Sequence, residues 1–337
     1  MKFARRYTRS DQNPLDQVAV ETRTTVITNP DGSEVFRMEN LEAPNSWSQL
    51  ASDIMASKYF RKRGVPKTGH ETSVTQVVNR LARTIRKMGD EQGGYFGSQD
   101  DADTFEAELA YHLVHQMGAF NSPTWFNCGL YHEYGIKGNE GNWHWDRKRD
   151  RVIEGKDSYA HPQCSACYIQ SVDDDLMQIF DLLKSEARLF KYGSGTGTNF
   201  SKIRGKMEKL TGGGTSSGLM SFLEVFDKGA GATKSGGITR RAAKMVCLDL
   251  DHPEIIEFIN WKAGEESKAA ALIRGGYSSD FNGEAYKTVS GQNSNNSIRI
   301  PDEFMKAYFD DGEWSTRLRT TGEIYKTYKA RDLMHQI

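Results

Sequence analysis

The sequence is poor in cysteine and proline, and it has no long apolar run. Its 337 residues include four cysteines and eight prolines. Four cysteines are too few for a disulfide scaffold and indicate a reducing compartment, so we expect a cytoplasmic protein. No apolar run approaches the roughly 18 residues that a membrane helix requires. The N-terminus has two arginines without an apolar stretch behind them, which predicts no secretory signal.

The sequence also lacks an excess of either charge. It contains 44 basic and 45 acidic residues, with a formal net charge of −1. This balance excludes a general electrostatic surface for nucleic acid or an anionic membrane, so a nucleotide site must be local. The length allows a substantial core and favours two structural units.

Three segments with different patterns divide the chain. Residues 1–44 form a polar N-terminal arm, with a hairpin predicted at Thr25–Val35 around an Asn-Pro-Asp-Gly turn. Residues 45–118 carry amphipathic helical patterns and predict a small helical domain. Residues 119–337 alternate strands with helices, which implies an α/β fold with parallel strands. The expected helices of the second segment are Ser48–Arg61, Ser73–Met88 and Thr104–Met117.

Within the third segment, aspartates precede a strong amphipathic helix that begins at Leu176 and continues to Phe190. A helix N-terminus favours such negative charge. Residues 136–160 are predicted to form a long polar excursion. The other expected elements are strands at Cys167–Val172 and Met245–Leu250 and helices at Leu219–Phe226 and Pro253–Trp261.

The segment richest in chemistry is Cys164–Asn199, which contains a Cys-x-x-Cys pair and a glycine-rich run. The pair Cys164 and Cys167 is typical of a redox couple or half a zinc site, or it is simply two half-buried thiols. No convincing second pair of ligands accompanies it, which disfavours zinc. The run Gly193–Asn199 predicts a turn that offers free amides and close backbone approach to a ligand, or merely a helix cap.

Three further segments are candidate ligand loops. In Phe120–Gly129, hydroxyls flank Pro123 and can contact a phosphate or ribose; the alternative is an ordinary turn. Lys234–Lys244 is a basic, glycine-hinged loop that suits phosphate or base contacts, or is a solvated charged loop. Gly212–Gly218 is a second flexible loop.

These segments, in this order, resemble the cobalamin-dependent (class II) ribonucleotide reductases. The resemblance spans nearly the whole chain, and the ordered set is highly specific although no single motif is decisive. The matching segments are Trp47–Gln49, Lys58–Lys62, Asn121–Thr124, Ser165–Cys167, Gly195–Asn199, Ser235–Gly237, Thr239–Ala243 and Asn295–Arg299.

The resemblance implies the amino-terminal half of a ten-stranded α/β barrel, preceded by the small helical domain. It implies radical reduction of ribonucleotides to deoxyribonucleotides for DNA synthesis, with adenosylcobalamin as cofactor. Cys167 is the expected catalytic residue: it supplies reducing equivalents and forms a redox-active disulfide with a distant cysteine. Cys164 has no counterpart in the family pattern, so we expect it to take no part.

The resemblance also assigns ligand positions, and no metal ligand is expected. The expected partners are a ribonucleoside di- or triphosphate substrate, a deoxynucleoside triphosphate effector, a second copy of the chain and a thioredoxin-like reductant. The substrate positions are Ser122, Thr124, Ala166, Cys167 and Gly195; the allosteric specificity site is Asp174, Leu176, Lys202 and Arg204; the base-sensing loop is Gly236, Gly237, Thr239 and Arg240.

One family landmark, an Asn-Pro-Cys-Ser-Glu motif that holds the thiyl-forming cysteine, does not occur in the sequence. We therefore expect the chain to be a fragment that is inactive alone and needs a companion chain with the other half, including most of the cobalamin pocket. The alternatives are a non-catalytic nucleotide-binding or regulatory module and a zinc or redox protein built on Cys164 and Cys167.

Overall fold

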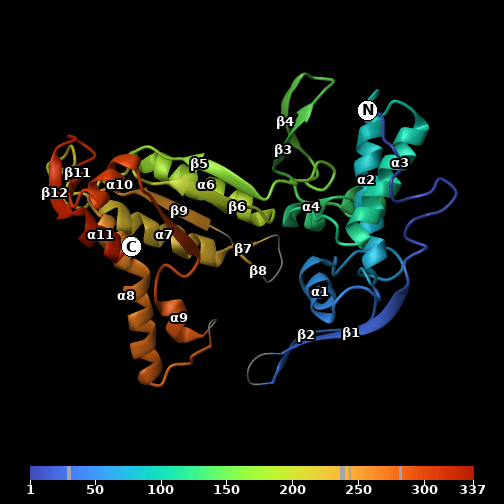
Figure 1. Cartoon of the computed structure of the whole chain (residues 1–337), viewed down its shortest axis with the longest axis horizontal. Helices are drawn as coiled ribbons and strands as arrows, with labels where there is room; N and C mark the ends of the chain where they lie inside the picture. The colour runs from blue at the N-terminus through green and yellow to red at the C-terminus, as the bar shows by residue number, and fades with distance from the viewer. Residues whose placement is uncertain (29–31, 236–239, 243, 281–282) are drawn as a thin grey trace. The chain divides into compact units, whose positions relative to one another are not determined.

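The protein consists of two compact units, Met1–Ala166 and Cys167–Ile337 (Figure 1). The predicted domain boundaries, between residues 44 and 45 and between residues 118 and 119, remain predictions. The contacts within the chain divide it into two units after Ala166. The structure, a computed structural model, describes residues 1–28, 32–235, 240–242, 244–280 and 283–337.

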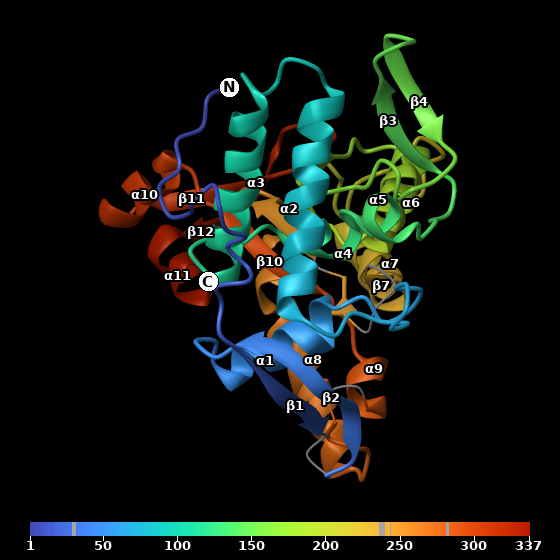
Figure 2. The ribbon, with the colours of Figure 1, turned by 90° about the vertical axis from the view of Figure 1, so that its right-hand side faces the viewer.

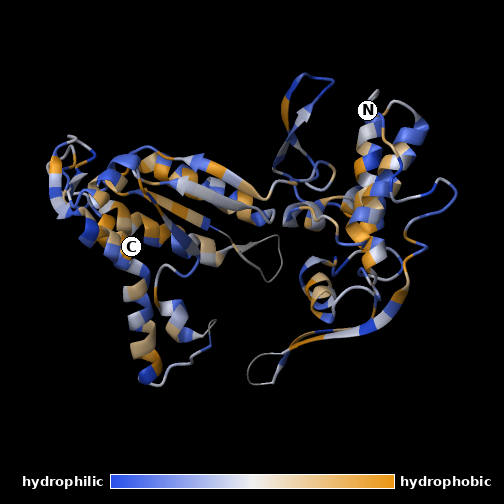
Figure 3. Ribbon diagram, viewed as in Figure 1, coloured by the Kyte–Doolittle hydropathy of each residue, from blue (hydrophilic) through white to orange (hydrophobic). Residues whose placement is uncertain are grey.

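The first unit is built on two long helices, α2 and α3, which lie side by side (Figure 1 and Figure 2). Hydrophobic and hydrophilic positions alternate along α2 (Figure 3). Val77, Val78 and Leu81 of this helix are fully buried, which confirms the predicted apolar face. The helices of this unit are α1 (Gln49–Ile54), a π-helical turn η1 (Met55–Tyr59), α2 (Val74–Glu91), α3 (Gln99–Val114), α4 (Ser122–Asn127) and α5 (Leu130–Tyr134).

Two antiparallel hairpins complete the first unit. The predicted hairpin near the N-terminus is confirmed and is longer than expected; its turn lies outside the described residues. The second hairpin occupies part of the predicted polar excursion, where Trp143 and Trp145 alternate with more buried residues. The strands are β1 (Val20–Thr28), β2 (Glu34–Pro44), β3 (Asn142–Asp146) and β4 (Arg151–Gly155).

One predicted helix differs from expectation. The segment Ser48–Arg61 begins with α1, capped by the Ser48 hydroxyl, but continues as η1 and ends at Tyr59. The wider π turn rotates the later side chains, so the expected single apolar face does not form. Leu50 and Ile54 are exposed, whereas Met55 is buried.

The second unit is built on a four-stranded parallel sheet in the order β10-β9-β6-β5. Each strand therefore lies beside the preceding main strand of the chain, as in a barrel that closes progressively. The predicted strand at Cys167 and the predicted strand at Met245 are both confirmed as members of this sheet. The strands are β5 (Cys167–Ser171), β6 (Gly195–Asn199), β9 (Lys244–Asp249) and β10 (Ser294–Arg299).

Helices connect these strands and pack on one face of the sheet. Ile179 of α6, Leu223 of α7 and Phe258 of α8 share one core cluster with Val246 and Leu248 of β9. All three predicted helices are confirmed, and α7 and α8 extend beyond their predicted ends. The helices are α6 (Leu176–Lys191), α7 (Gly218–Ala232), α8 (Ile255–Arg274), α9 (Glu284–Thr288), α10 (Asp302–Phe309) and α11 (Ala330–Gln336).

Two small antiparallel pairs accompany the parallel sheet. The first pair lies between α7 and β9, within the basic loop singled out in the sequence. The second pair precedes α11. These strands are β7 (Lys234–Ser235), β8 (Arg240–Arg241), β11 (Glu313–Arg317) and β12 (Ile324–Lys329).

The glycine-rich run at Gly193–Asn199 is the main correction to the predicted elements. The prediction of a turn is wrong for Gly195–Asn199, which form β6, a strand paired in parallel on both sides. Glycine weakens an isolated strand, and here the pairing with a neighbouring strand on each side compensates for that weakness.

Candidate functional site

The exposed face of the parallel sheet carries the candidate catalytic residue. Side chains alternate between the two faces of a strand, and the strand register places Cys167, Gly195 and Asn199 on one face together with Met245. In the described part of the second unit the helices cover the opposite face. Ile169, on the same face as Cys167, is 89% exposed. Cys167 therefore lies on the open face, which is the inner face of the sheet if it closes into a barrel.

Cys167 is the first residue of β5, and it pairs in register with Gly195, the first residue of β6. Cys167 is an exposed free cysteine, and Gly195 is buried. Because glycine has no side chain, the neighbouring strand leaves the thiol uncovered. Two expected substrate residues that are 28 positions apart in the sequence are thus adjacent, and the exposed thiol lies beside backbone that carries no side chain.

On the helix-covered face, a buried ion pair joins three elements of the sheet layer. Lys244 of β9 contacts Glu186 of α6, and the Thr196 hydroxyl donates to the same carboxylate at 3.3 Å. Burial raises the pKa of Glu186 and lowers the pKa of Lys244. Sequence reasoning missed this pair, although Glu186 shares the helical spacing of the apolar residues Leu182 and Phe190, which was a usable signal.

The expected effector residues meet at the N-terminus of α6. The Asp175 side chain caps this helix by accepting from the Gln178 amide at 3.0 Å. Lys202 Nζ lies 2.6 Å from an oxygen of Asp173, and Arg204 Nε lies 2.5 Å from an oxygen of Asp174. The structure therefore brings Asp174, Lys202 and Arg204 together.

Leu176, the fourth expected effector residue, is the first residue of α6 and is 57% exposed. Met177 and Phe180 are also exposed on this helix. Two cations beside a helix N-terminus can contact phosphate oxygens, and the exposed Leu176 offers an apolar contact next to them.

The structure describes the loop Gly212–Gly218 but only part of the basic loop Lys234–Lys244. In Gly212–Gly218, the Leu210 amide donates to the Gly214 carbonyl at 2.8 Å, which makes a tight turn before α7. Of the expected base-sensing residues, Gly236, Gly237 and Thr239 lie outside the described residues. Arg240 begins β8, and its strand pairs with β7.

The remaining expected substrate residues lie in the first unit. The segment predicted as a loop around Pro123 is instead a short helix, α4, because Asn121 caps it and Pro123 occupies its first turn. The Ser122 hydroxyl lies 3.1 Å from the Tyr59 hydroxyl. Thr124 is buried, and its hydroxyl lies 3.2 Å from the Cys164 carbonyl oxygen, to which it donates. Ala166 is half-buried at the end of the unit.

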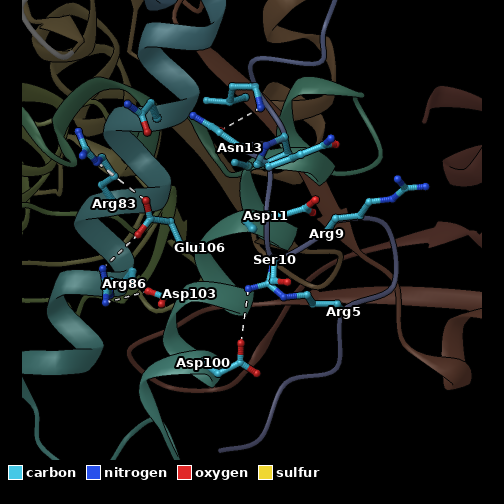
Figure 4. A pocket seen from close by; sticks show the side chains of 16 residues that line it. Arg5, Arg9, Ser10, Asp11, Asn13, Arg83, Arg86, Asp100, Asp103 and Glu106 are labelled. Carbon is cyan, nitrogen blue, oxygen red and sulfur yellow. Dashed lines mark hydrogen bonds and ion pairs between the residues drawn. The ribbon is translucent and has the colours of Figure 1, made fainter.

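A charged cavity of about 570 Å³ lies in the first unit between the N-terminal arm and helices α2 and α3 (Figure 4). Its arginines face carboxylates: Arg86 lies 3.1 Å from Asp103, and Arg5 lies 3.7 Å from Asp100. Burial raises the pKa of Glu106, which also pairs with Arg86. The opposed charges largely cancel, so the cavity is not a site for an anion. Its ion pairs hold the N-terminal arm against the helices.

Neither a membrane span nor a metal cluster is found among the described residues. No helix of the described segments is long and apolar enough to cross a membrane. The same residues contain no group of three or more histidine, cysteine, aspartate or glutamate side chains placed to hold a metal ion.

Family models match parts of both units. A model described as the ribonucleotide reductase barrel domain matches residues 165–335, about half of the chain and nearly all of the second unit. A second model, described as class II vitamin B12-dependent ribonucleotide reductase, matches residues 21–116 in the first unit. The parallel sheet and this match thus define a ribonucleotide reductase barrel segment.

Individual relatives show which class of ribonucleotide reductase the chain resembles. The vitamin B12-dependent ribonucleotide reductases of Rhodopirellula baltica, Streptomyces coelicolor and Bradyrhizobium diazoefficiens are 45%, 42% and 41% identical to this chain. Each alignment covers all of this chain and 32% to 35% of the relative. The chain belongs to the class II, vitamin B12-dependent ribonucleotide reductase family and spans about a third of the length of these relatives.

Proposed function

We propose that this chain supplies the reducing cysteine and the allosteric specificity site of a ribonucleotide reductase that uses adenosylcobalamin. The substrate is a ribonucleoside diphosphate or triphosphate, with a diphosphate as our first expectation. The observation that carries the proposal is the pairing of Cys167 with Gly195 on the open face of the parallel sheet. A barrel of ten strands would enclose this face.

In the proposed reaction, the ribose lies against Gly195 with its 2′-carbon near the Cys167 sulfur. The 2′ C–O bond breaks, the oxygen leaves as water, and a C–H bond replaces it. Cys167 and a second cysteine outside this sequence each give one electron and one hydrogen and end as a disulfide, which a thioredoxin-like protein reduces. Thr124, Ser122 and Ala166 complete the substrate site in this proposal.

Lys202 and Arg204 bind the triphosphate of a deoxynucleoside triphosphate effector, and Asp174 accepts a hydrogen bond from its ribose hydroxyl. The salt bridges to Asp173 and Asp174 hold both cations at the helix N-terminus until a phosphate replaces these carboxylates. Gly236, Gly237, Thr239 and Arg240 sense the base. The loop that contains them leads directly into β9.

Helix α6, which begins at the proposed effector site, also supports a proposed homodimer. Leu176, Met177 and Phe180 are exposed on α6, and apolar side chains in this number on one helix favour burial against a partner. Phe180→Glu is expected to weaken self-association, measured by sedimentation velocity. Met220→Glu places a charge at a partly buried position of α7. It is the comparison variant, and it shows how far a general loss of folding by itself weakens self-association.

The described cavities of the first unit do not fit the corrin of adenosylcobalamin. The charged cavity is lined by paired arginines and carboxylates, and the apolar one beside Trp47 and Tyr59 measures about 410 Å³. Both have the size of pockets for drug-sized ligands, and a corrin with its nucleotide loop is larger. These two cavities therefore do not hold the cofactor.

The test is reconstitution with a companion chain that carries the Asn-Pro-Cys-Ser-Glu motif, adenosylcobalamin, a ribonucleotide and a dithiol reductant. Deoxyribonucleotide formation is measured. We expect turnover with this chain and its loss with Cys167→Ser. Cys247→Ser is the matched control, because Cys247 lies on the same sheet face two strands away.

The outcomes separate the candidate functions. Turnover that survives Cys167→Ser contradicts the catalytic assignment. A chain that binds nucleotides but never restores turnover is a regulatory module. Stoichiometric zinc, measured by elemental analysis, would favour the remaining alternative, a zinc protein.

A further inference from the structure

Arg80 of α2 and Glu71, which precedes that helix, form a second buried ion pair, this one in the first unit. Their side chains are 1% and 0% exposed, and Arg80 Nε lies 2.7 Å from a Glu71 oxygen. Moving two charges out of water is costly, so such a pair persists only where further hydrogen bonds satisfy both groups. The other partners of Arg80 and Glu71 therefore indicate what the pair holds in place.

The terminal nitrogens of Arg80 hold the C-terminal end of α4. The guanidinium donates to the Trp125 carbonyl at 3.1 Å and to the Cys128 carbonyl. The last carbonyls of a helix have no partner within the helix, and a positive charge at that end is favourable. Gly129 leaves space for the arginine, since a Cβ there would lie 2.6 Å from the Arg80 Cγ atom. The end of α4 is therefore fitted to Arg80.

Glu71 connects the ion pair to the N-terminal end of α4. Its carboxylate accepts from the Arg61 amide at 2.7 Å, and its own amide donates to the Arg61 carbonyl at 2.9 Å. Arg61 follows Tyr59 by two residues, and the Tyr59 hydroxyl lies 3.1 Å from the Ser122 hydroxyl. The pair thus has a chain of contacts to the first residue of α4 as well as to its last carbonyls.

A helix as short as α4 cannot hold its own position. It has six residues, fewer than an isolated helix needs to be stable in water, so tertiary contacts must fix it. Ser122 and Thr124, two of the proposed substrate residues, lie in its first turn. The Cys128 amide donates to the Thr124 carbonyl at 3.0 Å and joins this turn to the end that Arg80 holds. A shift of that end therefore also moves the two hydroxyl side chains.

We propose that Arg80, held by Glu71, is a positioning residue that sets the place of Ser122 and Thr124 against the bound ribonucleotide. The inference rests on the proposed function, because it takes these two side chains as substrate contacts. It adds to that function a buried residue that acts through α4 rather than by contact with the substrate.

The test measures KM and kcat for the ribonucleotide in the reconstituted enzyme described above, with Arg80→Met in this chain. Displaced hydroxyls bind the substrate less well both before and during the reaction, so KM should rise about tenfold to a hundredfold with kcat nearly unchanged. A merely structural role has the opposite signature, because unfolded chains lower the apparent kcat and leave KM unchanged. That result would overturn the proposal.

Three further variants separate positioning from stability. Arg80→Lys keeps the charge but has one nitrogen in place of the planar fork, so its KM should lie between those of the wild type and Arg80→Met. Glu71→Gln/Arg80→Met removes both charges and should regain much of the lost stability, yet its KM should stay raised. A KM that returns to the wild-type value together with the stability would overturn the proposal.

The matched control is Arg86→Met on the same helix, because Arg86 pairs with Asp103 and Glu106 of α3. Its KM should equal that of the wild type, and a rise as large as that of Arg80→Met would contradict a specific role for Arg80.

Hydrogen–deuterium exchange of the full chain distinguishes a failure of this proposal from a failure of the proposed function. The Cys128 amide should exchange faster in Arg80→Met and at the wild-type rate in Arg86→Met. Unchanged exchange in Arg80→Met would show that Arg80 does not hold α4, and would overturn the proposal even if the enzyme turns over. Without turnover of the wild type, the dissociation constant of the ribonucleotide takes the place of KM; if the wild type also binds none, both proposals fail.

Discussion

Lys244 of β9 and Glu186 of α6 form a salt bridge that is buried between the sheet and its helices. The exposed fractions of the two side chains are 0% and 1%. The Lys244 Nζ atom also lies 4.3 Å from the ring centroid of Phe226. The pair connects the helix that begins beside Asp174 with the strand that the proposed base-sensing loop enters. It therefore joins the proposed effector site to the sheet that carries Cys167.

Removing one member of this pair should destabilise the second unit strongly. Glu186→Gln or Lys244→Met leaves an uncompensated buried group, and the expected cost is about 3 to 5 kcal/mol in the free energy of unfolding, measured with urea. The double variant Glu186→Met/Lys244→Met should recover much of this loss, because it removes both charges. If the free energy of unfolding of the single variants falls by less than about 1 kcal/mol, the pair is not buried as described.

Acid should destabilise the protein through His252. This buried ring donates from Nε2 to the Ile203 carbonyl at 2.8 Å and accepts at Nδ1 from the Glu254 amide at 3.0 Å, so it is neutral. Burial lowers the pKa of His252 from 6.5 to about 4. The unfolded chain binds the proton more tightly, so the stability is present above pH 6.5 and is lost as the pH falls towards 4.

The measurement for His252 is the free energy of unfolding as a function of pH. Between pH 7.5 and pH 5 the loss attributable to His252 should be about 2 kcal/mol. His252→Gln is expected to be less stable at neutral pH but to show a flatter dependence over this range. Identical slopes for the two proteins would contradict the assignment.

Gly218, at the start of α7, should not tolerate a side chain. Its φ is +82°, and a Cβ would lie 2.7 Å from the Lys206 backbone nitrogen and from a Glu254 oxygen. Gly218→Ala is therefore expected to cost about 2 kcal/mol or more. Gly212→Ala is the matched control in the same loop, because no atom lies within 4 Å of its Cβ. Equal thermal unfolding midpoints for both variants would refute this prediction.

Arg204→Ala should weaken binding of a deoxynucleoside triphosphate about tenfold to a hundredfold, because one charge-assisted hydrogen bond to phosphate is worth about 1.5 to 3 kcal/mol. Lys206→Ala is the control, since its Nζ instead pairs with Glu257 at 3.1 Å. Isothermal titration calorimetry measures both. A comparable loss for the two variants would indicate general electrostatic attraction rather than a site.

The sequence predicted the elements with strong local signals. The periodic apolar residues and the Asp175 cap were enough for α6, and the apolar run from Met245 was enough for β9. Among the residues that the resemblance assigns to the effector site, Arg204 pairs with Asp174, and Lys202 pairs with the adjacent Asp173. Their roles remain predictions.

Features set by tertiary contacts could not be predicted locally. The Gly195–Asn199 strand has poor intrinsic strand propensity and forms because β5 and β9 pair with it on both sides. The contact of Thr124 with the Cys164 carbonyl depends on how α4 packs against a segment 40 residues away. The change from α-helix to π-helix after Ile54 likewise has no local signal such as proline or glycine, and it begins at Met55, which is buried in the core.

The strand order of the second unit has a consequence for biosynthesis. β6 joins β5, β9 joins β6 and β10 joins β9, so each strand pairs with a neighbour that the ribosome has already released. The first strand, β5, must wait for β6, but each later strand of this sheet finds a neighbour that is already synthesised. Because proteins fold from the N-terminus during synthesis, the sheet can assemble one strand at a time behind the exit tunnel.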